Sequence, residues 1–358
     1  MAVESLISTL GSLHQQRVVV ISLLTVLLFV CAILGLAIGP LNIPAANVIS
    51  ILGDFANPFV NKQHDFVQET VIGSLRGPRV LLGLITGAAL AVSGACFQSL
   101  FRNPLADPAV IGVSAGAATA AVFYIVVGQG FIFALLGYVP KFGLPLAAMG
   151  GALLSVGVLY LFVNRKNGIN VATLLLAGIA INAFCSAITG ILVFLSDDQQ
   201  LRELTFWTLG SLARAQWDGV IPISIWLTIV LAILITKGNV LNALAIGEAD
   251  AFHMGVNVQR VKRILIIFGA AAVGAAVALT GIIGFIGLVV PHIARLLLGA
   301  DNRYVLPASA IAGALLMLLA DMFARTMVQP AELPIGIITS LLGAPFFLYL
   351  LSKRNFIR

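Results

Sequence analysis

Long stretches without a charged residue recur along this 358-residue chain. Four of them, at 18–39, 80–101, 171–195 and 333–352, contain 20 to 25 residues each. A helix of about 20 apolar residues crosses the roughly 30 Å hydrocarbon core of a bilayer. The stretches are apolar on every face and lack the alternation of a membrane β-strand. Together with 60% hydrophobic and 9% charged residues, they predict an all-α polytopic membrane protein.

We expect about ten membrane-spanning helices in a single transmembrane domain that covers residues 1–358. The first span is expected to remain in place, because Arg17 is the only basic residue before it and no small-residue cleavage site follows. Between the first two spans, residues 45–55 predict an amphipathic helix on the outer surface. The ten expected spans are approximately 18–39, 80–101, 109–128, 144–163, 171–195, 220–237, 263–282, 285–299, 306–324 and 333–352.

The distribution of basic residues sets the expected orientation. Cytoplasmic segments carry an excess of Lys and Arg, and with both termini cytoplasmic the inner segments hold 13 of the 20. The inner residues are Arg17, Arg102, Arg165, Lys166, Lys237, Arg260, Lys262, Arg263, Arg295, Arg303, Lys353, Arg354 and Arg358. The outer residues are Lys62, Arg76, Arg79, Lys141, Arg202, Arg214 and Arg325. The basic residues of both groups are scattered at span ends and do not form a continuous stripe, so we expect no nucleic-acid binding.

Two short helices are predicted in the cytoplasm, within residues 239–262. They cover 240–246 and 248–254, and each ends at a glycine, Gly247 or Gly255. Carboxylates in the first turn of a helix complement its positive end, and an asparagine before a helix caps it. The second short helix begins with Glu248 and Asp250, and Asn257 precedes the next span. This polar pair of helices between long spans is suited to contact a cytoplasmic partner.

The eighth span is short and interrupted. Gly281 and Gly284 precede it and Pro291 lies inside it, which predicts a broken helix that packs in protein or lines a cavity. Residues 88–94 and 275–281 share a pattern of small side chains. In the expected topology these two segments run in opposite directions, as an inverted repeat requires.

No motif on this chain predicts catalysis. The GxSxG pattern at 112–116 opens a span, where small residues serve close helix packing rather than a nucleophile elbow. The four histidines lack metal-ligand spacing, so we expect neither catalytic nor metal-binding residues. The chain has no GxxxxGK[ST] phosphate loop, so ATP used by this system must be hydrolysed by another chain.

Asp321 is the only acidic residue embedded in an expected span, and Arg325 follows it by four residues. An intramembrane carboxylate is a candidate proton relay, but this spacing favours a local ion pair.

A further feature of the sequence is the bend at 103–108, where Pro104 and Pro108 prevent a continuous helix. This bend is expected at the inner face of the membrane.

Separated motifs occur in a fixed order between residues 76 and 345. They are RGPR at 76–79, GAALA at 87–91, NPLADP at 103–108, GVS at 112–114, LLAG at 175–178, GFIGLVVPH at 284–292, ELPIG at 332–336 and GAP at 343–345. In this order they resemble the FecCD family of ABC-importer permeases, which carry ferric siderophores, haem and vitamin B12 across the bacterial inner membrane.

The resemblance implies a homodimer with ten helices in each copy, two ATPase subunits below that bind ATP and magnesium, and a periplasmic binding protein above. It implies no cofactor on this chain. It assigns ATPase coupling to Leu244, Gly247, Glu248, Ala251, Met254 and Gly255. It assigns docking of the binding protein to Arg76, Arg79 and Arg325. It assigns the cytoplasmic gate to Asn103, Pro104, Leu105, Asp107, Asn170, Val171 and Ala172.

The NPLADP form of the bend, which includes Asp107, is more similar to the haem members of the family. Haem is therefore the expected substrate, with a ferric siderophore as the close alternative and vitamin B12 after it. An ion-coupled secondary transporter is the alternative of another class. It would need an intramembrane charge to couple the gradient, and Asp321 already has a local partner.

Overall fold

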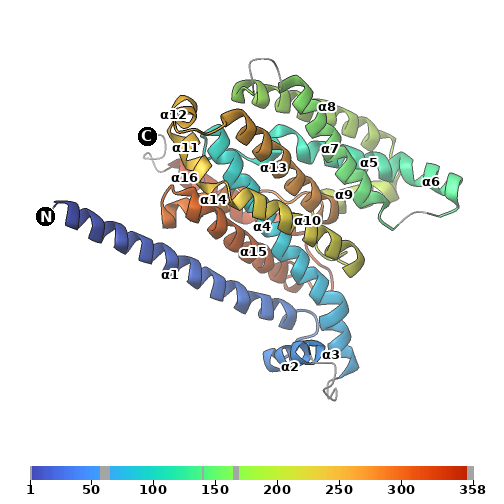
Figure 1. Ribbon diagram of the computed structural model, residues 1–358. Coiled ribbons are helices and arrows are strands. Elements are labelled where there is room, and N and C mark those ends of the chain that lie inside the picture. Colours follow the sequence, from blue (N-terminus) through green and yellow to red (C-terminus); the bar gives the residue numbers. More distant parts are fainter. Residues whose placement is uncertain (1, 57–64, 139–140, 164–168, 353–358) are drawn as a thin grey trace.

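The computed structural model describes residues 2–56, 65–138, 141–163 and 169–352, and every regular element in these ranges is a helix (Figure 1). In the described ranges, eight helical segments are long and apolar enough to cross a membrane. Two shorter apolar helices, α14 and α16, account for the eighth and tenth expected spans. The predicted polytopic all-α fold is therefore confirmed. The elements are α1 (Ala2–Ala37), α2 (Ala45–Ala56), α3 (Phe66–Thr70), η1 (Val71–Arg76), α4 (Gly77–Phe101), η2 (Pro108–Ile111), α5 (Val113–Phe123), η3 (Tyr124–Gly128), α6 (Gln129–Leu136), α7 (Gly143–Val163), α8 (Val171–Leu195), α9 (Asp198–Thr208), α10 (Trp217–Ile235), α11 (Gly238–Ile246), α12 (Glu248–His253), α13 (Val258–Thr280), α14 (Ile286–Leu298), α15 (Asn302–Thr326) and α16 (Ile335–Ser352).

Helix α4 forms the centre of the bundle and packs against α10, α13, α14 and α15 (Figure 1). Its small residues allow helix backbones to approach closely. Gly87 lies against Gly313 of α15, and Gly94 lies against Gly287 of α14, so that a Cβ atom on Gly87 or Gly94 would overlap a backbone carbonyl. In a membrane, such contacts supply packing energy that larger side chains would prevent.

The two copies of the small-residue pattern run antiparallel in α4 and α13. The Phe97 ring near the C-terminal end of α4 lies against Gly269 of α13. At the other end, Leu82 and Leu279 line one cavity. This arrangement has the direction that an inverted repeat requires, while the symmetry of the two halves stays a prediction.

The GxSxG segment is a packing element, as expected. Gly112 has φ +86° and precedes α5, and Ser155 of α7 donates a hydrogen bond to its carbonyl oxygen at 2.8 Å. Gly116 lies against Gly151 of α7. The turn and the close contact therefore explain these small residues.

The second span begins earlier than predicted. A continuous helical path runs from Phe66 through the π-helical η1 into α4, because Arg76 and Arg79 are buried in the protein instead of lying in a loop. The predicted helices at 45–55 and 285–299 are confirmed as α2 and α14. The orientation assigned to Lys62, Arg165, Lys166, Lys353, Arg354 and Arg358 concerns positions outside the described residues.

Candidate functional site

The two short helices that the sequence predicts within 239–262 are present, whereas their cytoplasmic location stays a prediction. Helix α11 ends at Ile246, and α12 begins at Glu248 after the extended Gly247. Glu248 and Asp250 lie in the first turn of α12, and the side chain of Asn257 accepts a hydrogen bond from the backbone N–H of Arg260 at 3.0 Å. We call α11 and α12 the coupling pair.

An ion pair anchors the coupling pair to the bundle. The Nζ atom of Lys262 on α13 lies 2.7 Å from Oε2 of Glu248. The same ammonium donates to the carbonyl oxygen of Ile169 at 2.8 Å, just before α8. Because Lys262 is only 2% exposed, its buried charge depends on these two acceptors. The contact thus joins α12, α13 and the entrance to α8.

The exposed face of the coupling pair differs from the predicted one. Met254 is 63% exposed, as a contact residue should be, but Leu244 and Ala251 are buried. These two side chains hold the helices against the bundle and cannot reach a partner in this conformation. Sequence reasoning missed Ile246 and Phe252, which are 68% and 69% exposed. Large apolar side chains exposed beside Glu248 provide a surface suited to protein contact.

A polar network connects α11 with the N-terminal end of α15 and the C-terminal end of α4. The amide of Asn242 donates to Asp301 at 2.7 Å, and its oxygen accepts from the backbone N–H of Asn302 at 2.8 Å. Asn302 in turn lies 3.1 Å from Ser99 of α4. Hydrogen bonds from Arg303 first, and also from Asn242, lower the pKa of Asp301 to about 2. No sequence motif indicated this network, because its members come from separate segments.

The three predicted docking arginines are buried and bonded inside the chain. Arg76 donates to the carbonyl oxygens of Leu36 and Ala37 at 2.7 and 2.8 Å. Arg325 donates to the carbonyl oxygen of Gly35 at 2.5 Å. Arg79 donates to Asp321 at 2.8 Å and to Glu332 at 3.0 Å. These contacts give the arginines a structural role, and docking of a binding protein stays a prediction.

The expected pair between Asp321 and Arg325 is present at 3.7 Å, but Arg79 is the closer partner of Asp321 at 2.8 Å. Sequence reasoning missed Arg79 because it lies 242 positions away. A hollow of about 300 Å³ reaches all three arginines and Glu332. An acidic group of another protein could approach the cluster from that side.

The predicted inner gate consists of two capped turns. Asn103 accepts a hydrogen bond from the backbone N–H of Leu105 at 2.9 Å, and Asp107 accepts one from Ala109 at 2.7 Å. Pro104 lies within the first turn and Pro108 begins η2. Burial raises the pKa of Asp107. Side-chain caps therefore fix the bend in place of a continuous helix.

The other half of the predicted gate is the start of α8. Asn170 accepts hydrogen bonds from the N–H groups of Ala172 and Thr173 at 2.8 and 3.3 Å, so Val171 begins a capped helix. The bend reaches α8 farther along, where Asn182 donates to the carbonyl oxygens of Ala109 and Val110 at 3.2 Å each. The bend at 103–108 is therefore joined to α8, the helix that begins with the other gate segment, through η2.

Comparison with known proteins places this geometry among transport permeases. The FecCD transport family matches residues 27–353. The hemin transport system permease protein HmuU of Yersinia pestis is 46% identical over 284 residues, which are 79% of this chain and 83% of that protein. The vitamin B12 import system permease protein BtuC of Vibrio cholerae is 39% identical over 298 residues, 81% of this chain and 85% of that protein. A solved metal-chelate type ABC transporter in an inward-facing conformation has a TM-score of 0.80 and 31% identity, and the match covers 93% of this chain and 99% of that one.

Proposed function

Because this chain belongs to the FecCD transport family, we propose that it moves haem across a bacterial inner membrane as the permease subunit of an ABC importer. The 46% identity with a hemin permease and the NPLADP bend support haem. Ferric siderophores and vitamin B12 are the alternative substrates, and B12 permeases of 39 to 40% identity are also relatives. The proposed topology has both termini in the cytoplasm, as the basic residues favour.

The observation that carries the proposal is the exposed apolar face of the coupling pair. Ile246, Phe252 and Met254 surround Glu248, and a hollow of about 600 Å³ lies beside Glu248 and Phe252. An ATPase subunit would fill this hollow and cover the apolar side chains. That subunit would bind ATP and magnesium, and this chain would contribute no catalytic residue.

Movement at the coupling pair has a route to the gate. Glu248 contacts Lys262, and Lys262 contacts Ile169 beside the cap of α8. Further along, α8 holds η2 through Asn182. We infer that ATP-driven movement of the coupling pair shifts α8 and the bend at 103–108 and so opens the inner end of the path.

A second copy of the chain would pack along α8. This helix is apolar over 25 residues, yet only Leu174, Gly178 and Leu192 are buried. Its exposed face includes the small residues Ala183 and Gly190, which permit close approach of another helix. The substrate path would then run between the two copies.

At the outer surface, a periplasmic binding protein would deliver the substrate. Acidic side chains of that protein would enter the hollow lined by Arg76, Arg79 and Arg325. Because such charges mainly steer and align a partner, association should weaken as ionic strength rises.

Reconstituted transport tests the proposal. Vesicles that contain the chain, its ATPase and its binding protein should take up haem only when ATP is inside the compartment with the ATPase. Uptake driven by a proton gradient without ATPase would instead support the secondary transporter. Uptake of a ferric siderophore or vitamin B12 in preference to haem would retain the importer but replace the substrate.

A further inference from the structure

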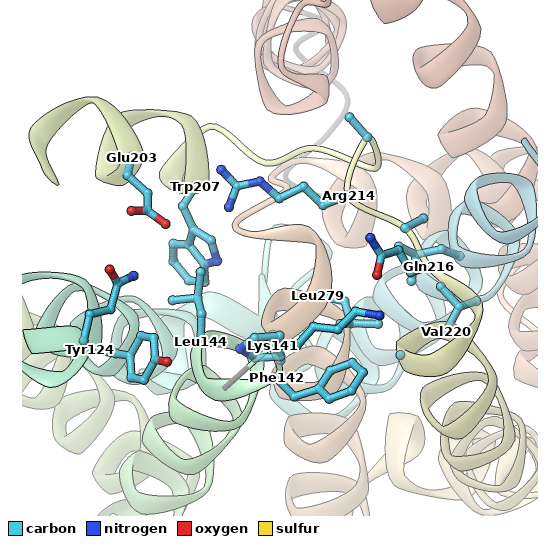
Figure 2. Close-up of a pocket in the computed structure, with 17 residues that line it drawn as sticks. Tyr124, Lys141, Phe142, Leu144, Glu203, Trp207, Arg214, Gln216, Val220 and Leu279 are labelled. Atoms are coloured by element: carbon cyan, nitrogen blue, oxygen red, sulfur yellow. The ribbon is translucent and has the colours of Figure 1, made fainter. Parts of the chain in front are cut away.

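A cavity of about 580 Å³ opens near the outer ends of α7, α10 and α13, beneath α9. We call it the outer cavity. Figure 2 shows that Glu203 and Arg214 lie on either side of the Trp207 ring, above Tyr124 and Lys141. The cavity lies apart from α8, η2 and the coupling pair, none of which lines it. The transport route proposed above leaves it without a role.

Two opposite charges in the outer cavity have no partner among the residues that the structure describes. Neither Glu203 nor Arg214 forms an ion pair or hydrogen bond with any other residue that the structure describes. Lys141, by contrast, is paired with Asp218 at 2.8 Å. The cavity therefore presents one carboxylate and one guanidinium that are both available to a ligand.

A buried hydroxyl group beside the outer cavity also lacks a hydrogen-bond partner among the described residues. Tyr124 is 6% exposed, and its hydroxyl has no hydrogen-bond partner within the described chain. Leaving a buried hydroxyl unbonded is unfavourable by an amount similar to a lost hydrogen bond. A ligand with acceptor oxygen atoms would remove this cost. Phosphate and ester oxygens are acceptors of that kind.

An apolar surface groove between α7, α10 and α13 is marked by the outer cavity and by a second, separate pocket nearer the membrane centre. Leu144, Val220 and Leu279 line the cavity from α7, α10 and α13. One to two turns deeper, the same three helices form a narrow pocket of about 50 Å³ that includes Met149, Trp226 and Ala275. Trp226 and its neighbour Leu153 in this pocket are 44% and 56% exposed. The groove is therefore open at the bundle surface, where acyl chains of the bilayer lie.

We propose that the outer cavity binds a phospholipid whose headgroup carries both a phosphate and a primary ammonium group. Arg214 binds the phosphate and Glu203 binds the ammonium, with N–H donors directed to its carboxylate. Tyr124 donates to a lipid oxygen, and one acyl chain follows the groove between α7, α10 and α13. The proposal needs only the membrane-spanning fold and does not depend on the transported substrate.

Competition among headgroups tests this assignment. The full-length chain is purified in detergent and exposed to equal amounts of phosphatidylethanolamine, phosphatidylcholine and phosphatidylglycerol with identical acyl chains. Retained lipid is counted by native mass spectrometry. Phosphatidylcholine has the phosphate but no N–H donor, and phosphatidylglycerol has no cation. We expect phosphatidylethanolamine to be retained about tenfold over both, as a charge-assisted hydrogen bond would give.

Two variants separate the contributions of the headgroup charges. Glu203→Gln should abolish the preference for phosphatidylethanolamine over phosphatidylcholine, and Arg214→Gln should reduce retention of all three lipids. Both should fold normally, because neither side chain has a partner in the described chain. Arg202→Gln is the matched control, since Arg202 is exposed on the same helix but does not line the cavity.

Three outcomes would overturn the proposal. The first is equal retention of the three lipids by the unmodified chain. The second is an unchanged preference in Glu203→Gln together with unchanged retention of all three lipids by Arg214→Gln. The third is displacement of bound phosphatidylethanolamine by haem at equimolar concentration, which would assign the outer cavity to a transported substrate.

Discussion

The carboxylate of Glu248 on α12 lies 2.7 Å from the buried ammonium of Lys262 on α13. Glu248 is half-exposed, whereas Lys262 is almost completely enclosed. Because the ammonium also bonds to Ile169, a change at the exposed partner alters a contact at the entrance to α8. The pair thus connects a surface that another protein can reach with a helix that lies in the membrane.

Reversing the charge at Glu248 should uncouple ATP hydrolysis from uptake. Glu248→Lys places a second ammonium beside Lys262 and removes the anchor of α12. We expect the complex with the ATPase to assemble and hydrolyse ATP while substrate uptake falls at least about tenfold. Both rates are measured in the same vesicles. Asp250→Lys makes the same charge change two residues further along α12, and this control should retain uptake. Equal uptake by both variants would remove Glu248 from coupling.

Shortening Phe252 should weaken the contact with the ATPase without destabilising the permease. The ring is 69% exposed, so Phe252→Ala should change the free energy of unfolding by less than about 0.5 kcal/mol. Loss of an apolar anchor at an interface should weaken association by about tenfold or more. Titration of the purified ATPase measures this, with Phe123→Ala at 53% exposure as the comparison. Identical affinities for the two variants would contradict the assignment of this surface.

Removing the charge of Asp321 should destabilise the outer end of the bundle. Asp321→Asn leaves the buried guanidinium groups of Arg79 and Arg325 without their shared anion. The expected cost is about 3 kcal/mol or more, since an unpaired buried charge is poorly tolerated. Glu332 is one-third exposed, so Glu332→Gln should cost less than about 1 kcal/mol. Thermal unfolding in detergent compares the two variants. Similar losses of stability would show that the burial of the carboxylate does not determine how much each ion pair contributes.

The glycine contact between α4 and α14 should not tolerate a methyl group. Gly94→Ala places a Cβ atom against the backbone of Gly287, and the expected destabilisation is about 1–3 kcal/mol. Gly157→Ala provides the contrast, because a Cβ at this position on α7 has no atom within 4 Å. That substitution should be neutral or stabilise the helix by up to about 1 kcal/mol. If both substitutions changed the unfolding temperature by the same amount, α14 would have to shift away from α4 at no cost to make room for the methyl group.

The free energy of unfolding should fall at low pH because Asp301 becomes protonated. Its pKa of about 2 lies below the ordinary value of 3.8 because of hydrogen bonds from Arg303 and then Asn242. The unfolded chain therefore binds more protons in this interval, so the contribution of Asp301 is complete above about pH 4 and is lost as the pH falls towards 2. Asp301→Asn keeps a side chain that can cap α15 but cannot titrate. Its unfolding temperature should fall less between pH 4.5 and 3 than that of the unmodified chain.

The spans could be predicted from sequence because burial in lipid leaves a strong local signal, the absence of charge over about 20 residues. The signals for the coupling pair and for the Asn257 cap of α13 were equally local. The buried cluster was different, since Arg79 and Asp321 are 242 positions apart and a span that begins with arginines looks like a loop. Only the folded bundle shows that each arginine has an acceptor.

The orientation of the coupling pair was harder to predict than its existence. Helices of nine and six residues have too few turns for a periodic apolar face, so Leu244 and Phe252 could not be distinguished as inner and outer from their spacing. Packing against the bundle decides that Leu244 is buried and Phe252 exposed. The outer cavity was also beyond sequence reasoning, because its lining comes from six separate stretches of the sequence.

Unequal anchoring divides the bundle into a stiff part and a compliant part. Helix α4 is held to its neighbours through backbone contacts at Gly87 and Gly94, which leave no space to slide. Helix α8 has only three buried residues in 25 and is joined to the coupling pair through Ile169, just before its first turn. A displacement of α12 is therefore passed to α8, which can move, while α4 stays fixed against its neighbours.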